Sequence, residues 1–77
     1  MKHKSKLVQS FGINSHDDFE AFRKAINPNP TWTAIYYNVI MLGTTYEKAG
    51  EPFAMTKMAV YFRLRKAKHD YDKRTAK

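Results

Sequence analysis

The stretch 30-PTWTAIYYNVIMLGTTYEKAG-50 is apolar on nearly every side when drawn on a helical wheel. Trp32 and Val39 fall in one broad sector, whereas Met41 falls roughly opposite. An apolar surface this wide is typical of a helix that is covered by other parts of the chain on several sides. We therefore predict one central buried helix over about 30–48, against which the rest of the chain packs.

Local signals predict where this central helix begins and ends. The segment 27-NPNP-30 is a sharp boundary, because each proline disfavours helical backbone in the residue before it. Asn29 can cap the helix, and Pro30 suits its first position, where an N–H group is not needed. Gly43 predicts close approach by another helix, and Gly50 is the expected C-terminal cap.

Two shorter helices are predicted before the central one. A short helix over about 5–11 can end at Gly12 in a left-handed conformation. A second helix is predicted over 16–26, with Ser15 as its N-cap and three acidic residues in its first turn. Its apolar positions recur three and four residues apart, beginning with Phe19, so it is expected to pack on the core.

A last helix is predicted over about 52–72, with Pro52 in its first turn. One apolar stripe is its expected core face, and this stripe consists of Phe53, Val60, Leu64, Ala67 and Tyr71. Beyond Ala67 the helix becomes polar and is expected to project from the body. The pattern as a whole predicts an all-α fold, a small bundle of three main helices with a short N-terminal helix in addition.

Length and composition limit what the chain can be. It has 77 residues, which predicts a single domain over 1–77 with frayed ends at 1–5 and 73–77. It has no cysteine, so disulfides and thiolate metal sites are excluded. The N-terminal sequence lacks the long apolar run of a secretory signal, and the longest apolar stretch is too short to span a bilayer. We expect a soluble cytoplasmic protein.

Positive charge is concentrated at the C-terminal end. Residues 57–77 contain eight Lys and Arg against two Asp, so this part holds six of the seven excess positive charges of the chain. Such a field attracts nucleic acid, an anionic membrane or an acidic protein surface, and charge alone does not choose among them.

Catalytic and metal-binding signals are weak. His3, His16 and His69 have no further ligand at a spacing that builds a metal site. Ser10 and Ser15 have no base placed near them by the sequence, and no glycine-rich phosphate loop is present. The sequence therefore predicts neither an enzyme nor a protein that holds a metal or another cofactor.

The first functional hypothesis is nucleic-acid binding, to DNA or RNA, through the last helix. Residues 33–68 are the better candidate for a helix-turn-helix, and the N-terminal helix pair is a weaker one, because acidic residues open its second helix. The predicted phosphate contacts come from Lys57, Arg63, Arg65, Lys66, Lys68, Lys73 and Arg74.

The second hypothesis is a protein-binding adaptor or inhibitor, which would dock its basic helix on an acidic partner surface. Its candidate partner-binding residues are Met55, Met58, Tyr61 and Phe62. Met55, Met58 and Phe62 form one apolar stripe on the helical wheel, which we call the Met/Phe stripe. Because so short a chain needs its apolar side chains for the core, we favour contacts inside the bundle as the interpretation of this stripe. A homodimer through Tyr37, Ile40 and Met41 is a further alternative, and a membrane surface is the weakest.

Overall fold

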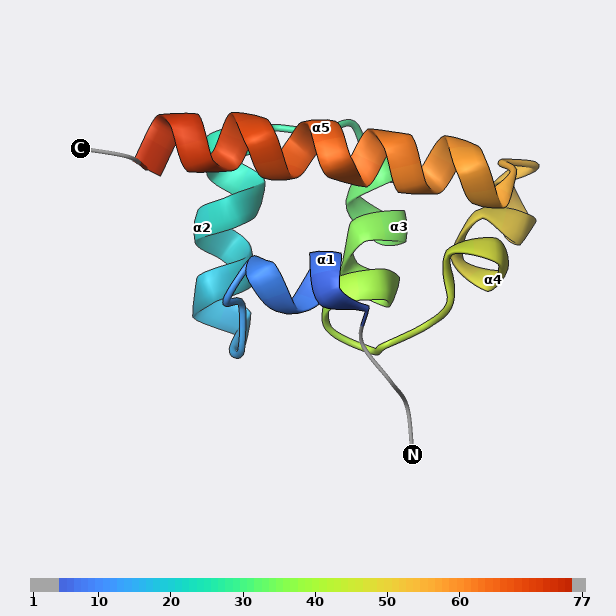
Figure 1. Ribbon diagram of the computed structural model, residues 1–77, viewed down its shortest axis with the longest axis horizontal. Helices are drawn as coiled ribbons and strands as arrows, with labels where there is room; N and C mark the ends of the chain where they lie inside the picture. The colour runs from blue at the N-terminus through green and yellow to red at the C-terminus, as the bar shows by residue number, and fades with distance from the viewer. Residues whose placement is uncertain (1–4, 76–77) are drawn as a thin grey trace.

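A computed structural model describes residues 5–75, and these residues form helices and loops without any strand (Figure 1). The predicted all-α fold and small bundle are therefore confirmed. The elements are α1 Lys6–Ser10, α2 His16–Ile26, α3 Pro30–Ile40, α4 Tyr46–Gly50, a 3₁₀ turn η1 Glu51–Phe53, and α5 Lys57–Thr75.

Side-chain caps fix the predicted starts of α2 and α3. The Ser15 hydroxyl accepts a hydrogen bond of 3.1 Å from the Asp18 N–H, and the Asn29 side chain accepts one of 2.9 Å from the Trp32 N–H. These bonds satisfy N–H groups that have no partner within a helix. Gly12 has a φ of +67°, so the left-handed conformation predicted after the first helix is also confirmed.

The prediction of one central helix over 30–48 is wrong. Helix α3 ends at Ile40, and Gly43 takes a φ of +71°, where a residue with a side chain would be strained. The Thr45 hydroxyl then accepts from the Lys48 N–H at 3.2 Å and starts the separate helix α4. Gly43 therefore reverses the chain rather than admitting a neighbouring helix, and Gly50 is the last residue of α4 rather than the cap of a long helix.

The last helix also begins later than predicted. Pro52 lies in the 3₁₀ turn η1, and Ala54 has a φ of +57°, which interrupts helical backbone before α5. The Thr56 hydroxyl accepts from the Ala59 N–H at 3.1 Å and caps α5, which begins at Lys57. Met55 thus precedes the helix and does not lie on one of its faces.

Helix α5 lies along the long axis of the molecule, across the ends of α2 and α3 (Figure 1). Its inner face buries Val60, Leu64 and Ala67 completely or nearly so. Four residues further, the Tyr71 ring packs edge-on against Phe22, with ring centroids 5.2 Å apart. The prediction that α5 projects from the body after Ala67 is therefore wrong, since the helix stays packed for another turn.

The first half of the opening segment is the centre of the core, as predicted. Five residues of α3 are buried, namely Trp32, Ile35, Tyr36, Val39 and Ile40. Because Ile40 is fully buried, and Tyr37 and Met41 are half-buried against the core, the surface suggested for a homodimer is already occupied within the chain.

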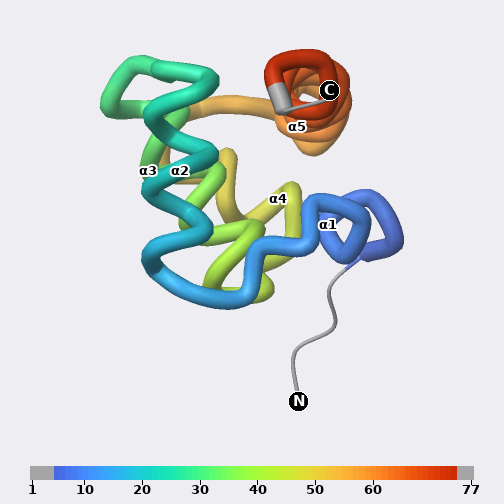
Figure 2. The backbone as a smooth tube through the Cα atoms, turned by 90° about the vertical axis from the view of Figure 1, so that its left-hand side faces the viewer, coloured from blue at the N-terminus to red at the C-terminus, as the bar shows by residue number. Residues whose placement is uncertain are grey.

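Seen along its axis, α5 lies at one corner of the molecule, with the other helices beside and below it (Figure 2). One side of the helix is consequently left uncovered. Of the ends predicted to be frayed, 1–5 and 73–77, Ser5 caps α1 and residues 73–75 are helical, and the remaining residues 1–4 and 76–77 lie outside the described part of the chain. No helix within residues 5–75 combines the length and apolar character needed to cross a membrane.

Candidate functional site

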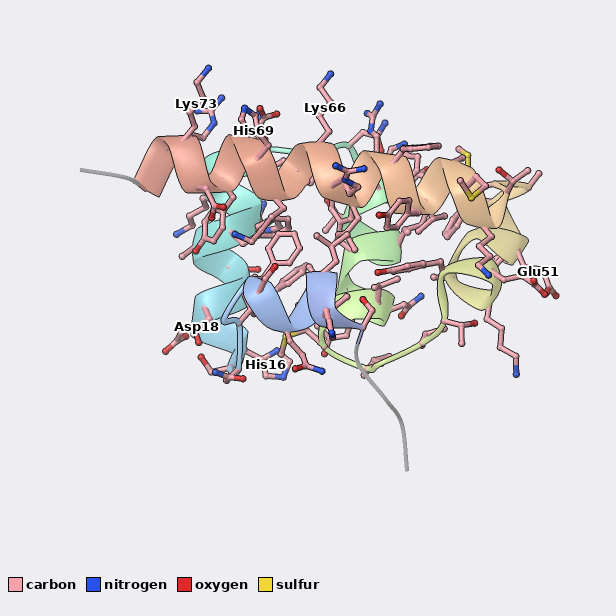
Figure 3. The ribbon with its side chains drawn as sticks, viewed as in Figure 1. His16, Asp18, Glu51, Lys66, His69 and Lys73 are labelled. Atoms are coloured by element: carbon pink, nitrogen blue, oxygen red, sulfur yellow. The ribbon has the colours of Figure 1, made fainter. Side chains whose placement is uncertain are left out.

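The uncovered side of α5 carries side chains about one helical turn apart. We call it the outer face of α5, and it consists of Met58, Phe62, Arg65, Lys66, His69 and Lys73, all of them exposed. At 100° per residue these positions lie opposite the buried stripe of the same helix. Lys66, His69 and Lys73 point away from the body of the molecule (Figure 3).

The N-terminal end of the outer face is apolar. Met58 is 53% exposed and Phe62 is 56% exposed, so neither contributes to the core. The favoured interpretation of the Met/Phe stripe as an internal contact is wrong for these two residues, because α2 and α4 pack against α5, and Gly50 of α4 lies against the buried Val60 on the opposite side. It holds for Met55, which is half-buried against the core.

A row of aromatic rings flanks Phe62 on the body side. The Phe62 ring lies 5.5 Å from that of Tyr61, and the Tyr61 ring lies 5.8 Å from that of Tyr46 on α4, measured between centroids. The Tyr46 hydroxyl is hydrogen-bonded to that of Ser5 at 2.5 Å. The half-buried Tyr61 therefore supports Phe62 from the side, while Phe62 remains accessible from solvent.

Arg63 has a structural role that its charge alone does not predict. Its guanidinium carbon lies 4.9 Å from the ring centroid of the buried Trp32, a cation–π geometry. Burial raises the pKa of the nearby Tyr36 hydroxyl, and a hydrogen bond with Arg63 and the charge of Arg63 oppose this rise. Arg63 is exposed, but it also covers the edge of the core.

Lys68 and Arg65 also interact within the molecule. Lys68 forms an ion pair with Asp72, its ammonium nitrogen lies 5.8 Å from the Phe11 ring centroid, and its side chain is only 19% exposed. Arg65 lies 5.8 Å above the Tyr61 ring but remains exposed. Of the predicted phosphate-binding residues, Lys68 is thus the least available.

The remaining predicted cations differ in position. Lys66 and Lys73 lie on the outer face, and Arg74 is exposed beside it. Lys57 lies at the start of α5, where it lines a cleft of about 490 Å³. The other residues around this cleft come from α1, the end of α3, the following loop and α4, and they are Ser5, Val8, Val39, Thr44, Thr45, Tyr46, Glu47 and Lys48.

Five of the seven acidic residues lie on α2, α4 and η1 rather than on α5. Asp17 and Asp18 open α2, where the Asp18 carboxylate accepts a hydrogen bond of 3.1 Å from the Asn14 N–H. Glu51 lies at the end of the molecule near α4, and Asp18 lies at the side opposite Lys66 (Figure 3). Asp70 and Asp72 lie on α5 itself but beside the outer face rather than on it, so the outer face carries Arg65, Lys66 and Lys73 and forms a positive surface.

The helix-turn-helix predicted over 33–68 is not formed by two helices. This segment contains α3, α4, η1 and the first part of α5, and the helix before the corner is the five-residue α4. The predicted phosphate-binding cations therefore all lie on α5, which no helix of similar length precedes at the corner. Within the described chain, no group of three or more His, Cys, Asp or Glu residues could hold a metal ion.

Positions 58, 62, 66, 69 and 73 lie on one side of a helical wheel, so this row is present in the sequence. Only the folded arrangement shows that the other helices leave this side uncovered. No protein-family model matches the chain, and no curated protein or solved structure shows significant similarity to it.

Proposed function

We propose that this protein binds nucleic acid through the outer face of α5. The observation that supports the proposal is a set of exposed cations on one helix whose opposite side is fixed in the core. These cations are Arg65, Lys66, Lys73 and Arg74. Within residues 5–75, no ion pair joins any of the four to a carboxylate.

Availability and rigidity make these cations suited to phosphates. Lys and Arg release condensed counterions when they neutralise phosphates, and this release supplies much of the affinity of non-specific binding. Helix α5 has 19 residues, and its buried contacts continue to Tyr71, so its cations are presented on an ordered scaffold. Of the two carboxylates on α5, Asp72 is paired with Lys68, and Asp70 is half-buried beside the outer face.

The proposal is tested by the salt dependence of binding to labelled single-stranded and duplex oligonucleotides. The double variant Lys66→Gln/Lys73→Gln should bind more weakly than the wild type. If each lysine contacts one phosphate, the slope of log affinity against log salt should fall in magnitude by about 1.4 for single strands and about 1.8 for duplex.

Lys24→Gln/Lys48→Gln is the matched control. It removes the same charge, two units from the formal net charge of +7, but from exposed positions on α2 and α4. It should change affinity and slope much less. Absence of salt-sensitive binding to any oligonucleotide would refute the proposal, and equal losses in the two variants would refute the placement of the site on α5.

A second candidate function is docking on a protein as an adaptor or inhibitor. The exposed pair Met58 and Phe62, four residues apart and followed by cations, favours it, because amphipathic helices use such anchors in apolar grooves with acidic rims. This candidate predicts binding to a purified acidic partner that persists at high salt and is lost in Phe62→Asp. Nucleic-acid binding by phosphate contacts would instead be lost at high salt.

A further inference from the structure

We infer that the nucleic acid bound by the outer face of α5 is single-stranded, and that an unpaired base stacks on the ring of Phe62. This inference rests on the proposed function and adds the form of the ligand. It begins from a large aromatic ring that is 56% exposed on the same face as the free cations.

Phe62 is distinguished from other aromatic residues near α5 by what covers its ring. Arg63 lies over Trp32, Arg65 lies over Tyr61, and Lys68 lies near Phe11, so three rings are covered by cations of the same helix. In the part of the chain that the structure describes, no such contact is made to the Phe62 ring. Its free surface is open to a planar group from outside.

Single strands offer what this ring can bind. In a duplex the base faces are stacked on one another, and proteins reach only base edges and the backbone, where a phenyl ring gains little apart from contact with a thymine methyl group. In a single strand each base presents a face that can stack on an aromatic side chain, whatever its sequence. An exposed phenylalanine in a cationic surface therefore favours unpaired bases.

The surroundings of Phe62 suit a stacked base and its phosphates. Tyr61 lies beside Phe62 and is itself packed toward Tyr46, so the ring is supported on its body side. Met58 lies one turn before it and extends the apolar platform with a polarisable thioether. Lys66 lies one turn after it, about 6 Å along the helix axis, in position for an adjoining phosphate.

A second copy of the chain does not suit this surface. Parallel pairing of two outer faces would bring Arg65 and Lys66 of one copy toward the same cations of the other, and antiparallel pairing around Phe62 would place Lys66 against Met58 rather than against a carboxylate. Like charges brought together in this way are unfavourable. A polyanion with exposed apolar planes satisfies both the charges and the ring.

The test compares the full chain with Phe62→Leu, which keeps an apolar side chain but removes the ring. Labelled oligo(dT), oligo(rU) and a duplex of equal length are titrated at one salt concentration. Phe62→Leu should weaken single-strand binding by roughly 5- to 140-fold and leave duplex binding unchanged. Phe62→Trp should bind single strands at least as well as the wild type, because it restores an aromatic plane.

Leu42→Ala is the matched control for exposed apolar surface. Leu42 is 45% exposed and lies in the loop after α3, away from the outer face of α5, so its removal should leave all affinities unchanged. Since phosphates and base faces are common to both nucleic acids, oligo(dT) and oligo(rU) should bind within a few-fold of each other. Thermal melts should show that Phe62→Leu remains folded, because its side chain is outside the core.

The outcomes separate this inference from the proposed function. Wild-type preference for duplex, or equal effects of Phe62→Leu on duplex and single strands, would overturn the inference and leave the proposed function standing. A preference above tenfold for one sugar would contradict recognition through phosphates and base faces alone. If neither form binds, both the inference and the proposed function fail.

Discussion

Replacing Tyr71 by alanine tests whether the C-terminal half of α5 is part of the fold. The Tyr71 ring contacts Phe22 edge-on at 5.2 Å and is stacked near Phe11 at 6.4 Å, measured between centroids. These contacts join the last helix to α2 and to the residue that follows α1. If α5 projected beyond Ala67, none of them would exist.

The expected loss follows from the burial of this side chain. Truncating a fully buried aromatic residue to alanine typically costs about 3–5 kcal/mol, and each aromatic pair contributes roughly 0.5–1.5 kcal/mol beyond burial. Tyr71 is half-buried, so we expect Tyr71→Ala to lower the free energy of unfolding by about 2 kcal/mol. For a domain of this size, that loss lowers the melting temperature by roughly 8–16 °C.

Circular dichroism measures the effect through thermal and urea unfolding. Lys73→Ala on the exposed side of the same helix is the control, and it should change stability by less than about 0.5 kcal/mol. A loss for Tyr71→Ala as small as that of the control would refute the packing of α5 against α2. Such a result would also contradict the view that α5 presents Lys66 and Lys73 on an ordered scaffold.

Two further predictions concern the core. At Gly50 an added Cβ would lie 2.7 Å from the Met55 carbonyl oxygen and 2.8 Å from a Val60 methyl carbon, so Gly50→Ala should destabilise by about 1–3 kcal/mol in urea unfolding. Stabilisation would contradict this packing, because helix propensity alone favours alanine by about 1 kcal/mol. The pKa of Tyr36 is raised above its usual 10.0 chiefly by burial, so the unfolded chain releases this proton first as pH rises. The stability that Tyr36 contributes should therefore be fully present below pH 10 and fall above it. Urea midpoints measured across this pH range should fall less in Tyr36→Phe than in the wild type. An unchanged pH dependence in this variant would contradict the raised pKa.

The start of each predicted helix was most reliable where local chemistry determines it. Ser15 and Asn29 cap α2 and α3 with their own side chains, and these bonds span only three residues. Because such bonds need no tertiary partner, sequence alone predicts them. The same signal marks Thr45 and Thr56 as caps of α4 and α5, but the apolar run across Gly43 outweighed it at Thr45, and the expected start at Pro52 outweighed it at Thr56.

The end of α3 was not predictable from periodicity alone. Apolar residues continue past Ile40, so a wheel drawn through Gly43 still shows a broad apolar surface. The positive φ of Gly43 turns the chain so that α4 can pack against α5, a choice that depends on contacts with residues distant in sequence. The start of the last helix was predicted too early for a separate reason, because Pro52 lies in η1 and the positive φ of Ala54 interrupts the helical backbone between Pro52 and Met55.

For the candidate site, the sequence predicted the charge of α5 but not which charges are free. Arg63 lies over Trp32, which is 31 positions earlier in the chain, and Lys68 reaches the Phe11 ring across the core boundary. Such contacts depend on how α3 and α1 are placed against α5. Only the folded arrangement separates these cations from Lys66, which points outward.

This separation explains how one basic helix can both complete the core and offer a binding surface. Cations on its flanks cover aromatic rings that would otherwise be more exposed to water, as Arg63 does for Trp32. Substituting such a cation should therefore lower the stability of the fold. Lys66 covers no such ring, and Phe62 has none of these cations over it. Substitutions at these two positions should therefore act on binding while leaving the fold intact. A helix that served only to complete the core would not need an exposed phenylalanine among uncovered cations, and this combination is what favours an anionic ligand with stacking surfaces.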